Sequence, residues 1–247
     1  MTTELDAEAQ PGYRRRIAIE PAAGTVRAEL EDDYHRMVVD LWHEDGIISC
    51  IESDMKRGPW TTCDAARAQL EKTFQGKPLG DPSFRNDKTL NCTHLYDLAT
   101  FCVDHAGTGE AVLYDIFVSD PQDGVVFARL YRNNQCRLDW QLRDGKFLVP
   151  GEVAGKGLTE IGKWIAGLTP QLEASARILR WAAMIAGGRA ISMPAGMVGS
   201  EIGLIGTCHT FQPGTADIAR RKPGADMDFS AGSDGPMADR AEMFTRD

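Results

Sequence analysis

The sequence predicts an α+β fold in which two groups of antiparallel strands pack against several helices. Three observations support this fold class: apolar and polar residues alternate in two separate blocks, turn-forming residues separate the alternating runs, and helical spacing of apolar residues follows each block. Grouped strands followed by helices are typical of α+β folds. We expect one domain over residues 1–222, ending in a helical segment, and a loose polar tail over 223–247.

The first block predicts a β-meander within the first 60 residues. Its alternating runs are residues 15–20, 25–33, 35–43 and 47–53. Turn signals separate them, among them Glu44-Asp45-Gly46, which is typical of a hairpin. His35 has the same parity as Met37, Val39 and Leu41. Because alternate residues of a strand share one face, we expect the His35 imidazole on the buried face.

Helical spacing then predicts a helix over residues 64–74, with Asp64 as its N-cap, and a loop over 76–87. A second helix is expected over 93–106. Its apolar stripe comprises Leu95, Leu98, Ala99, Cys102, Val103 and Ala106. His94 and Asp97 lie off that stripe, so we expect them outside the buried face.

The second block of strands covers residues 111–118, 125–132, 136–142 and 147–149. A short helix over 158–165 follows, and then a longer one over 170–186, which begins at Thr169-Pro170 and stops at Gly187-Gly188. The longer helix is apolar on most sides. It is therefore expected to be central or to form a subunit contact, and we expect a homo-oligomer, with a homodimer as the simplest form.

Composition argues against several classes of function. The net charge is −9 and no basic patch is visible, so a nucleic-acid partner is not expected. No apolar run reaches the roughly 18 residues of a membrane span, and the acidic N-terminus lacks the pattern of a signal peptide, so the cytoplasm is the expected compartment. Six scattered cysteines without a Cys-x-x-Cys pair predict free thiols.

The segment from Cys92 to Leu98 carries a thiol, an imidazole, a phenol and a carboxylate at the start of a predicted helix. His94 and Asp97 are i, i+3 neighbours, so Asp97 could orient His94 for proton transfer. Tyr96 projects elsewhere and is a weaker candidate. In the alternative interpretation these residues are structural: a buried thiol, an imidazole near the cap, and a first-turn carboxylate favoured by the helix dipole.

Three further segments suggest a site. Tyr34 and His35 follow two aspartates and resemble an acid/base pair, although an acidic turn before a core histidine explains them equally simply. Trp60 and Cys63 could frame an aromatic ligand, but base rates favour core packing. Arg16, in a run of three arginines, could bind an anionic group or protect an exposed strand edge.

A metal site remains an alternative. Cys63, Cys92, His94 and Asp97, or His35 in place of one of them, could assemble a zinc site of soft and borderline ligands. Their intervals match no standard zinc spacing, so we predict no metal. The glycines between Gly196 and Gly206 match neither a dinucleotide fingerprint nor a phosphate loop.

Several of these motifs occur together in a known family. The motifs are Arg14–Ile19, Glu31-Asp32-Asp33-Tyr34-His35, Pro59–Cys63, Cys92–Leu98 and Cys208-His209-Thr210-Phe211. Across nearly its whole length, the chain resembles a bacterial domain family of unknown function and, within it, the γ-formaldehyde lyases of sphingomonad lignin-dimer catabolism. The resemblance implies a cofactor-independent lyase that converts a phenylcoumaran-type biaryl, a small aromatic substrate, to a stilbene and formaldehyde.

Residue chemistry assigns roles for such a reaction. His94, oriented by Asp97, and His35 are the expected bases, Tyr34 is a donor, and Arg16 is the charge partner. Trp60, Tyr96 and Cys63 are expected to contact the substrate. The rival hypothesis is a non-catalytic binding or assembly module that uses the helix over 170–186 as its contact surface.

Overall fold

The computed structural model describes residues 10–85, 88–230 and 234–243. The strands are β1 (Gly12–Ala22), β2 (Thr25–Asp32), β3 (Arg36–Glu44), β4 (Ile47–Arg57), β5 (Val112–Ser119), β6 (Val125–Arg132), β7 (Gln135–Arg143) and β8 (Lys146–Val149). The α-helices are α1 (Ala66–Phe74), α2 (Thr93–His105), α3 (Gly162–Ile165), α4 (Pro170–Ala186) and α5 (Thr215–Ile218). Short 3₁₀ helices are η2 (Pro82–Arg85), η3 (Lys88–Leu90), η4 (Gly151–Val153), η5 (Gly187–Ala190), η6 (Gly199–Ile202), η7 (His209–Phe211) and η8 (Ala238–Met243). The predicted α+β class is confirmed.

The strands follow one another along the hydrogen bonds in the order β4-β3-β2-β1-β5-β6-β7-β8. The pairs β2–β3, β3–β4, β5–β6, β6–β7 and β7–β8 are antiparallel. Three tight hairpin turns place both central residues at positive φ: Asp45-Gly46, Asn133-Asn134 and Asp144-Gly145. Glycine, asparagine and aspartate tolerate this conformation best, which explains why the turn signals in the sequence located the hairpins correctly.

The backbone contacts divide the chain into two compact units. One unit comprises the described residues up to Arg16, Leu113–Ser192 and the described residues from Asp228; the other comprises Ile17–Val112 and Met193–Met227. The division passes through β1, between Arg16 and Ile17. Composition along the chain could not indicate it, because each unit is assembled from segments distant in sequence.

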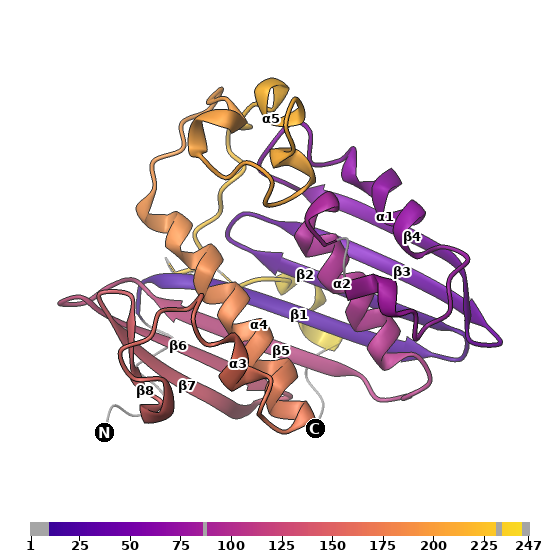
Figure 1. Cartoon of the computed structure of the whole chain (residues 1–247), viewed down its shortest axis with the longest axis horizontal. Coiled ribbons are helices and arrows are strands. Elements are labelled where there is room, and N and C mark those ends of the chain that lie inside the picture. Colours follow the sequence, from indigo (N-terminus) through magenta and orange to yellow (C-terminus); the bar gives the residue numbers. More distant parts are fainter. Residues whose placement is uncertain (1–9, 86–87, 231–233, 244–247) are drawn as a thin grey trace. The chain divides into compact units, whose positions relative to one another are not determined.

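In the unit that contains β2, β3 and β4, helices α1 and α2 cover one face of these strands (Figure 1). Met37, Val39 and Leu41 of β3 are fully buried, and the Cys102 thiol of α2 donates a hydrogen bond to the Val39 carbonyl oxygen at 3.8 Å. The predicted parity of this strand is confirmed. Helix α2 therefore approaches the face on which His35 was expected.

In the other unit, α4 contacts β6 and β7, and Trp140 packs against Phe147 with 5.2 Å between ring centroids. The buried residues of α4 are Ser175, Ala176, Ile178, Leu179 and Ala182, whereas Leu172 and Met184 are exposed. The helix is thus amphipathic within its own unit, because its apolar residues concentrate on one side. Among the described residues, no helix combines the length and apolar character required to cross a bilayer.

The described residues after Lys222 pack instead of forming a loose tail. Ala225, Phe229 and Met237 are buried. The Met227 N–H donates to the Asp33 carbonyl oxygen at 2.7 Å. These few apolar side chains anchor the segment to the rest of the protein. The average composition of the segment is polar and therefore did not indicate this packing. Residues 231–233 and 244–247 of the predicted tail lie outside the described residues.

Candidate functional site

Two imidazoles from distant parts of the chain meet in one place. His35 follows the turn between β2 and β3, and His94 lies in the first turn of α2. Their rings stack with 3.9 Å between centroids and 30° between planes. Both residues are buried, with relative exposures of 8% and 6%. His94 was expected outside the buried face of its helix; this expectation is wrong, because the imidazole packs on His35 as part of that face.

Asp32, which ends β2 and is fully buried, orients His35. Its Oδ1 accepts the backbone N–H groups of Tyr34 and His35, each at 2.8 Å, and lies 3.1 Å from His35 Nδ1. A carboxylate accepts hydrogen bonds, so Asp32 favours the tautomer of His35 that carries its proton on Nδ1 and leaves Nε2 as the acceptor. From the sequence, Asp32 belongs either to an acid/base motif with Tyr34 and His35 or to an acidic turn before a core histidine. Its position three residues before His35 was the available signal.

Arg57 fixes the backbone of this turn. Its guanidinium donates to the carbonyl oxygens of Asp32 at 2.7 Å, Asp33 at 3.0 Å and His35 at 3.4 Å. It also forms an ion pair with Glu31 at 3.2 Å. Five donors on a rigid planar group allow one arginine to hold several acceptors. His35 is therefore positioned by its partner Asp32 and by a clamp on its own backbone, and nothing in the sequence pattern singled out Arg57.

Asp97 and Tyr96 have surroundings that differ from those expected. Lys88 Nζ donates to both carboxylate oxygens of Asp97, each at 2.7 Å. Tyr96 is buried and packs edge-on against Phe74, with 5.3 Å between centroids. We therefore assign Asp97 to an ion pair at the start of α2 and Tyr96 to the core. Spacing along one helix could not anticipate a lysine from the preceding 3₁₀ helix.

Arg16 lies in the unit that contains β5. Its Nε donates to Asp115 Oδ1 at 2.6 Å and its Nη1 to the Pro236 carbonyl oxygen at 3.3 Å. The expected role of Arg16 as charge partner is thus not supported by its contacts. In the unit that contains the two histidines, the Arg221 guanidinium lies 6.0 Å from the centroid of the Tyr34 ring and 5.7 Å from that of Trp60.

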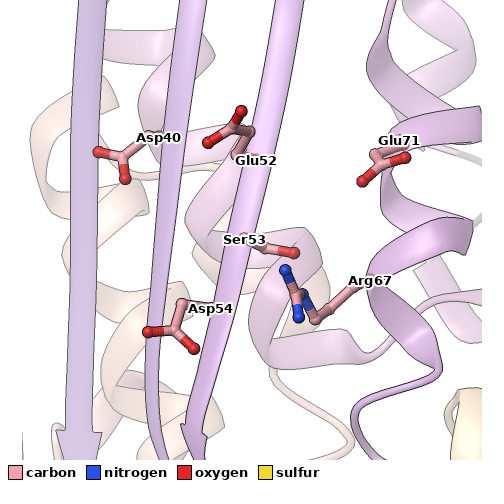
Figure 2. Close-up of a pocket in the computed structure, with 6 residues that line it drawn as sticks. All are labelled: Asp40, Glu52, Ser53, Asp54, Arg67 and Glu71. Carbon is pink, nitrogen blue, oxygen red and sulfur yellow. The ribbon is translucent and has the colours of Figure 1, made fainter.

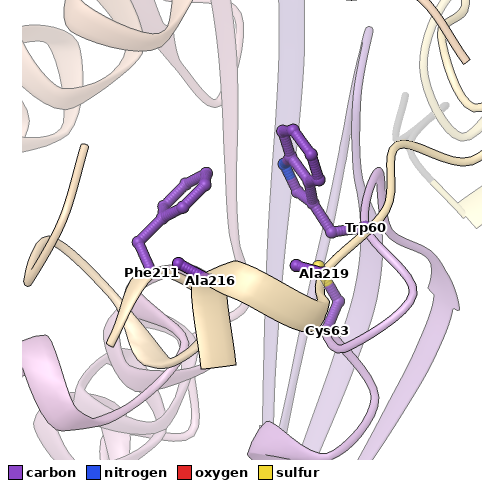
Figure 3. Close-up of a cluster of buried hydrophobic side chains, with 5 residues drawn as sticks. All are labelled: Trp60, Cys63, Phe211, Ala216 and Ala219. Atoms are coloured by element: carbon purple, nitrogen blue, oxygen red, sulfur yellow. The ribbon is translucent and has the colours of Figure 1, made fainter. Parts of the chain in front are cut away.

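Trp60 and Cys63 belong to a small buried cluster, completed by Phe211, Ala216 and Ala219 (Figure 3). The Trp60 and Phe211 rings meet edge to face, with 5.5 Å between centroids. The Thr210 hydroxyl donates to the Cys63 sulfur at 3.6 Å. These contacts agree with core packing, the structural interpretation of both residues. The Trp60 ring also has a charged neighbour, the Arg221 guanidinium.

Burial raises the pKa values of the Cys63, Cys92 and Cys102 thiols above the ordinary thiol value. We expect the free energy of unfolding to fall as the pH rises above about 9, because the thiols then ionise in the unfolded chain but stay protonated in the folded one. Urea titrations between pH 7 and pH 10.5 measure this. A Cys102→Ala variant, with one buried thiol fewer, should decline less steeply; an equal decline would contradict the assignment.

Among the described residues, Asp32, His35 and His94 form a group whose possible ligand atoms lie within 4.8 Å of one another. The zinc set built on Cys63 and Cys92 is not assembled in this part of the chain. Imidazoles and carboxylates are ligands of zinc as well as groups that transfer protons, so this arrangement is chemically suited to either role.

A separate cavity of about 410 Å³ is lined by Asp40, Glu52, Ser53, Asp54, Arg67 and Glu71 (Figure 2). Its side chains come from β3, β4 and α1. Four carboxylates and one guanidinium would repel a phenolate. This cavity is therefore not the expected aromatic slot.

No family model, no curated protein and no solved structure matches the chain.

Proposed function

We propose that the protein is a lyase that releases formaldehyde from a lignin-derived phenolic biaryl of the phenylcoumaran type and leaves a stilbene. The observation that carries the proposal is the buried pair of His35 and His94, with Asp32 bound to the first imidazole. Two buried imidazoles, one of them hydrogen-bonded to a carboxylate, are suited to general acid/base catalysis. The resemblance described above supplies the substrate class.

The proposed reaction begins at the para-hydroxyl of the substrate. Loss of its proton gives a phenolate, whose electrons open the benzylic C–O bond and form a quinone methide. A base then removes the proton of the γ-hydroxymethyl group. The bond between the β- and γ-carbons breaks, formaldehyde leaves, and the electron pair restores the aromatic ring. The oxygen freed from the benzylic carbon and the para-oxygen then take up the two protons removed earlier, so that atoms and charge balance without an added oxidant or cofactor.

The site residues divide this work. His35 Nε2, free to accept because Nδ1 faces Asp32, is the base for the γ-hydroxyl group. His94, in contact with His35, is the base for the para-hydroxyl group, and it returns that proton to the oxygen freed from the benzylic carbon. Tyr34, whose ring lies 6.1 Å from that of His35, is a donor beside them. The rings of the histidine pair are in contact, so the substrate approaches their edges rather than the space between them.

A direct assay tests the proposal. The purified protein is incubated with a phenylcoumaran that carries a free para-hydroxyl group and, in parallel, with its O-methyl ether. We expect one equivalent each of formaldehyde and stilbene from the phenol and no turnover of the ether, because only the phenol can form the phenolate. Failure to release formaldehyde from the phenol, or equal release from the ether, would contradict the proposal.

We also propose that the protein is cytoplasmic and that it forms a homodimer. Light scattering measures the mass of the particle and so tests the homodimer.

A further inference from the structure

We infer that Arg221 is the binding site for an aromatic oxyanion, the charged end of the substrate, and that Asp226 occupies this site when no ligand is bound. The inference rests on the proposed function for the identity of the substrate. It rests on the structure for the identity of the residue. The ligand class is an aryl ring that bears a phenolate or carboxylate oxygen.

The exposure of the ion pair between Arg221 and Asp226 is uneven. The Arg221 side chain is 2% exposed, whereas the Asp226 side chain that accepts its hydrogen bond is 51% exposed. The guanidinium therefore lies immediately beneath a carboxylate at the solvent boundary. An incoming oxyanion can replace that carboxylate and leave the buried guanidinium paired at the end of the exchange.

The neighbours of Arg221 favour an aromatic anion over an inorganic one. Its guanidinium lies 6.0 Å from the Tyr34 ring centroid and 5.7 Å from that of Trp60. Both rings are buried, with exposures of 8% and 4%. Guanidinium groups stack on aromatic faces and bind planar oxyanions with paired N–H donors. A ligand with an oxyanion on an aryl ring matches both kinds of contact.

Arg221 is also connected to the proposed catalytic pair. Tyr34 precedes His35 in the chain, and their rings lie 6.1 Å apart, edge to face. One aromatic side chain thus separates the buried cation from the imidazole that we assign as a base. A biaryl is long enough to place an oxyanion at one end and a reacting side chain nearer the other. A cation held there stabilises the phenolate whose electrons drive the C–O cleavage.

The backbone holds Arg221 in place and turns its neighbour outward. The Arg221 N–H donates to the Met197 carbonyl oxygen at 2.9 Å, and Arg221 pairs with Trp60 in a short bridge. Arg220 is exposed and its guanidinium donates to the carbonyl oxygens of Asp217 and Ala219. The two consecutive arginines therefore differ in burial and in partners, which makes Arg220 a matched control.

Calorimetric titration with vanillate and with its uncharged amide tests the inference. We expect the wild-type protein to bind vanillate about tenfold more tightly than vanillamide, and Arg221→Gln to lose this preference while Arg220→Gln keeps it. Asp226→Asn should tighten vanillate binding severalfold, because the internal competitor is removed. Asp226 is exposed, so this variant remains informative if Arg221→Gln fails to fold.

The outcomes separate the inference from the proposed lyase activity. An Arg221→Gln protein that keeps the preference, or an Asp226→Asn protein with unchanged or weaker vanillate binding, would overturn the anion site whatever the turnover. If Arg221→Gln loses the preference for vanillate and the wild-type protein releases no formaldehyde from the phenolic phenylcoumaran, the anion site is retained and the lyase activity is rejected. Binding is measured without turnover, so each conclusion is independent of the other.

Discussion

His94→Gln should lower the rate of formaldehyde release from the phenolic phenylcoumaran by about 10²-fold or more. Glutamine is close to histidine in size and polarity but cannot accept and return a proton near neutral pH. His94 is 6% exposed and stacks on His35, so the substitution removes one member of the proton-transfer pair while largely filling its space. The rate of formaldehyde formation under single-turnover conditions measures the effect.

The matched control is His105→Gln at the other end of α2. The His105 ring nitrogen Nδ1 lies 2.9 Å from the Phe101 carbonyl oxygen, within the same helix and away from the pair. We expect near-normal turnover in this variant. Circular dichroism should show both proteins folded. If His94→Gln turns over substrate at nearly the wild-type rate, His94 has no part in the mechanism.

Substitutions of Asp32 should separate its catalytic effect from its structural one. Asp32→Asn keeps an oxygen that can accept the N–H groups of Tyr34 and His35, so we expect the fold to survive. The negative charge beside His35 Nδ1 is lost, and turnover should fall by about 10²-fold because the imidazolium that forms during proton transfer is no longer stabilised. Asp32→Ala leaves the N–H groups without an acceptor and should reduce the free energy of unfolding by about 1–3 kcal/mol per group.

Urea denaturation and the formaldehyde assay are needed together for the Asp32 variants. We expect Asp32→Asn to be stable but slow, and Asp32→Ala to be both less stable and slow. Asp32→Asn with wild-type turnover would show that the carboxylate serves the turn alone. That result would leave the histidine pair without the orienting group that supports its assignment.

Local patterns were sufficient to predict much of the fold. Alternation and turn residues located all the strands to within a few residues, and the proline at position 170 and the glycines after Ala186 bounded α4. The parity of β3 placed His35 on the buried face. These features depend on neighbours within a few positions, which a single sequence displays directly. The two-unit division depends on segments far apart in the chain, so no local pattern carries it.

The contrast between local patterns and contacts of distant segments also explains which residues of the candidate site could be predicted. His35 and His94 were proposed from residue type and position, and the structure brings them together. Their partners were assigned less well: Asp97 binds Lys88, while Asp32 binds His35. Arg57 and Arg221 were not among the predicted site residues. Arg57, on β4, reaches a carbonyl oxygen at the end of β2, and Arg221, after α5, lies 6.0 Å from the centroid of the Tyr34 ring. Such side-chain contacts require the folded chain.

The central claim is that His35 and His94 act as one proton-transfer unit, and a double-mutant cycle tests it most directly. Formaldehyde release is measured for His35→Gln, for His94→Gln and for the protein carrying both changes. Residues that act as a unit give losses that do not add, so the doubly substituted protein should be about as slow as the slower single variant. Independent losses that multiply in the double variant would contradict the claim.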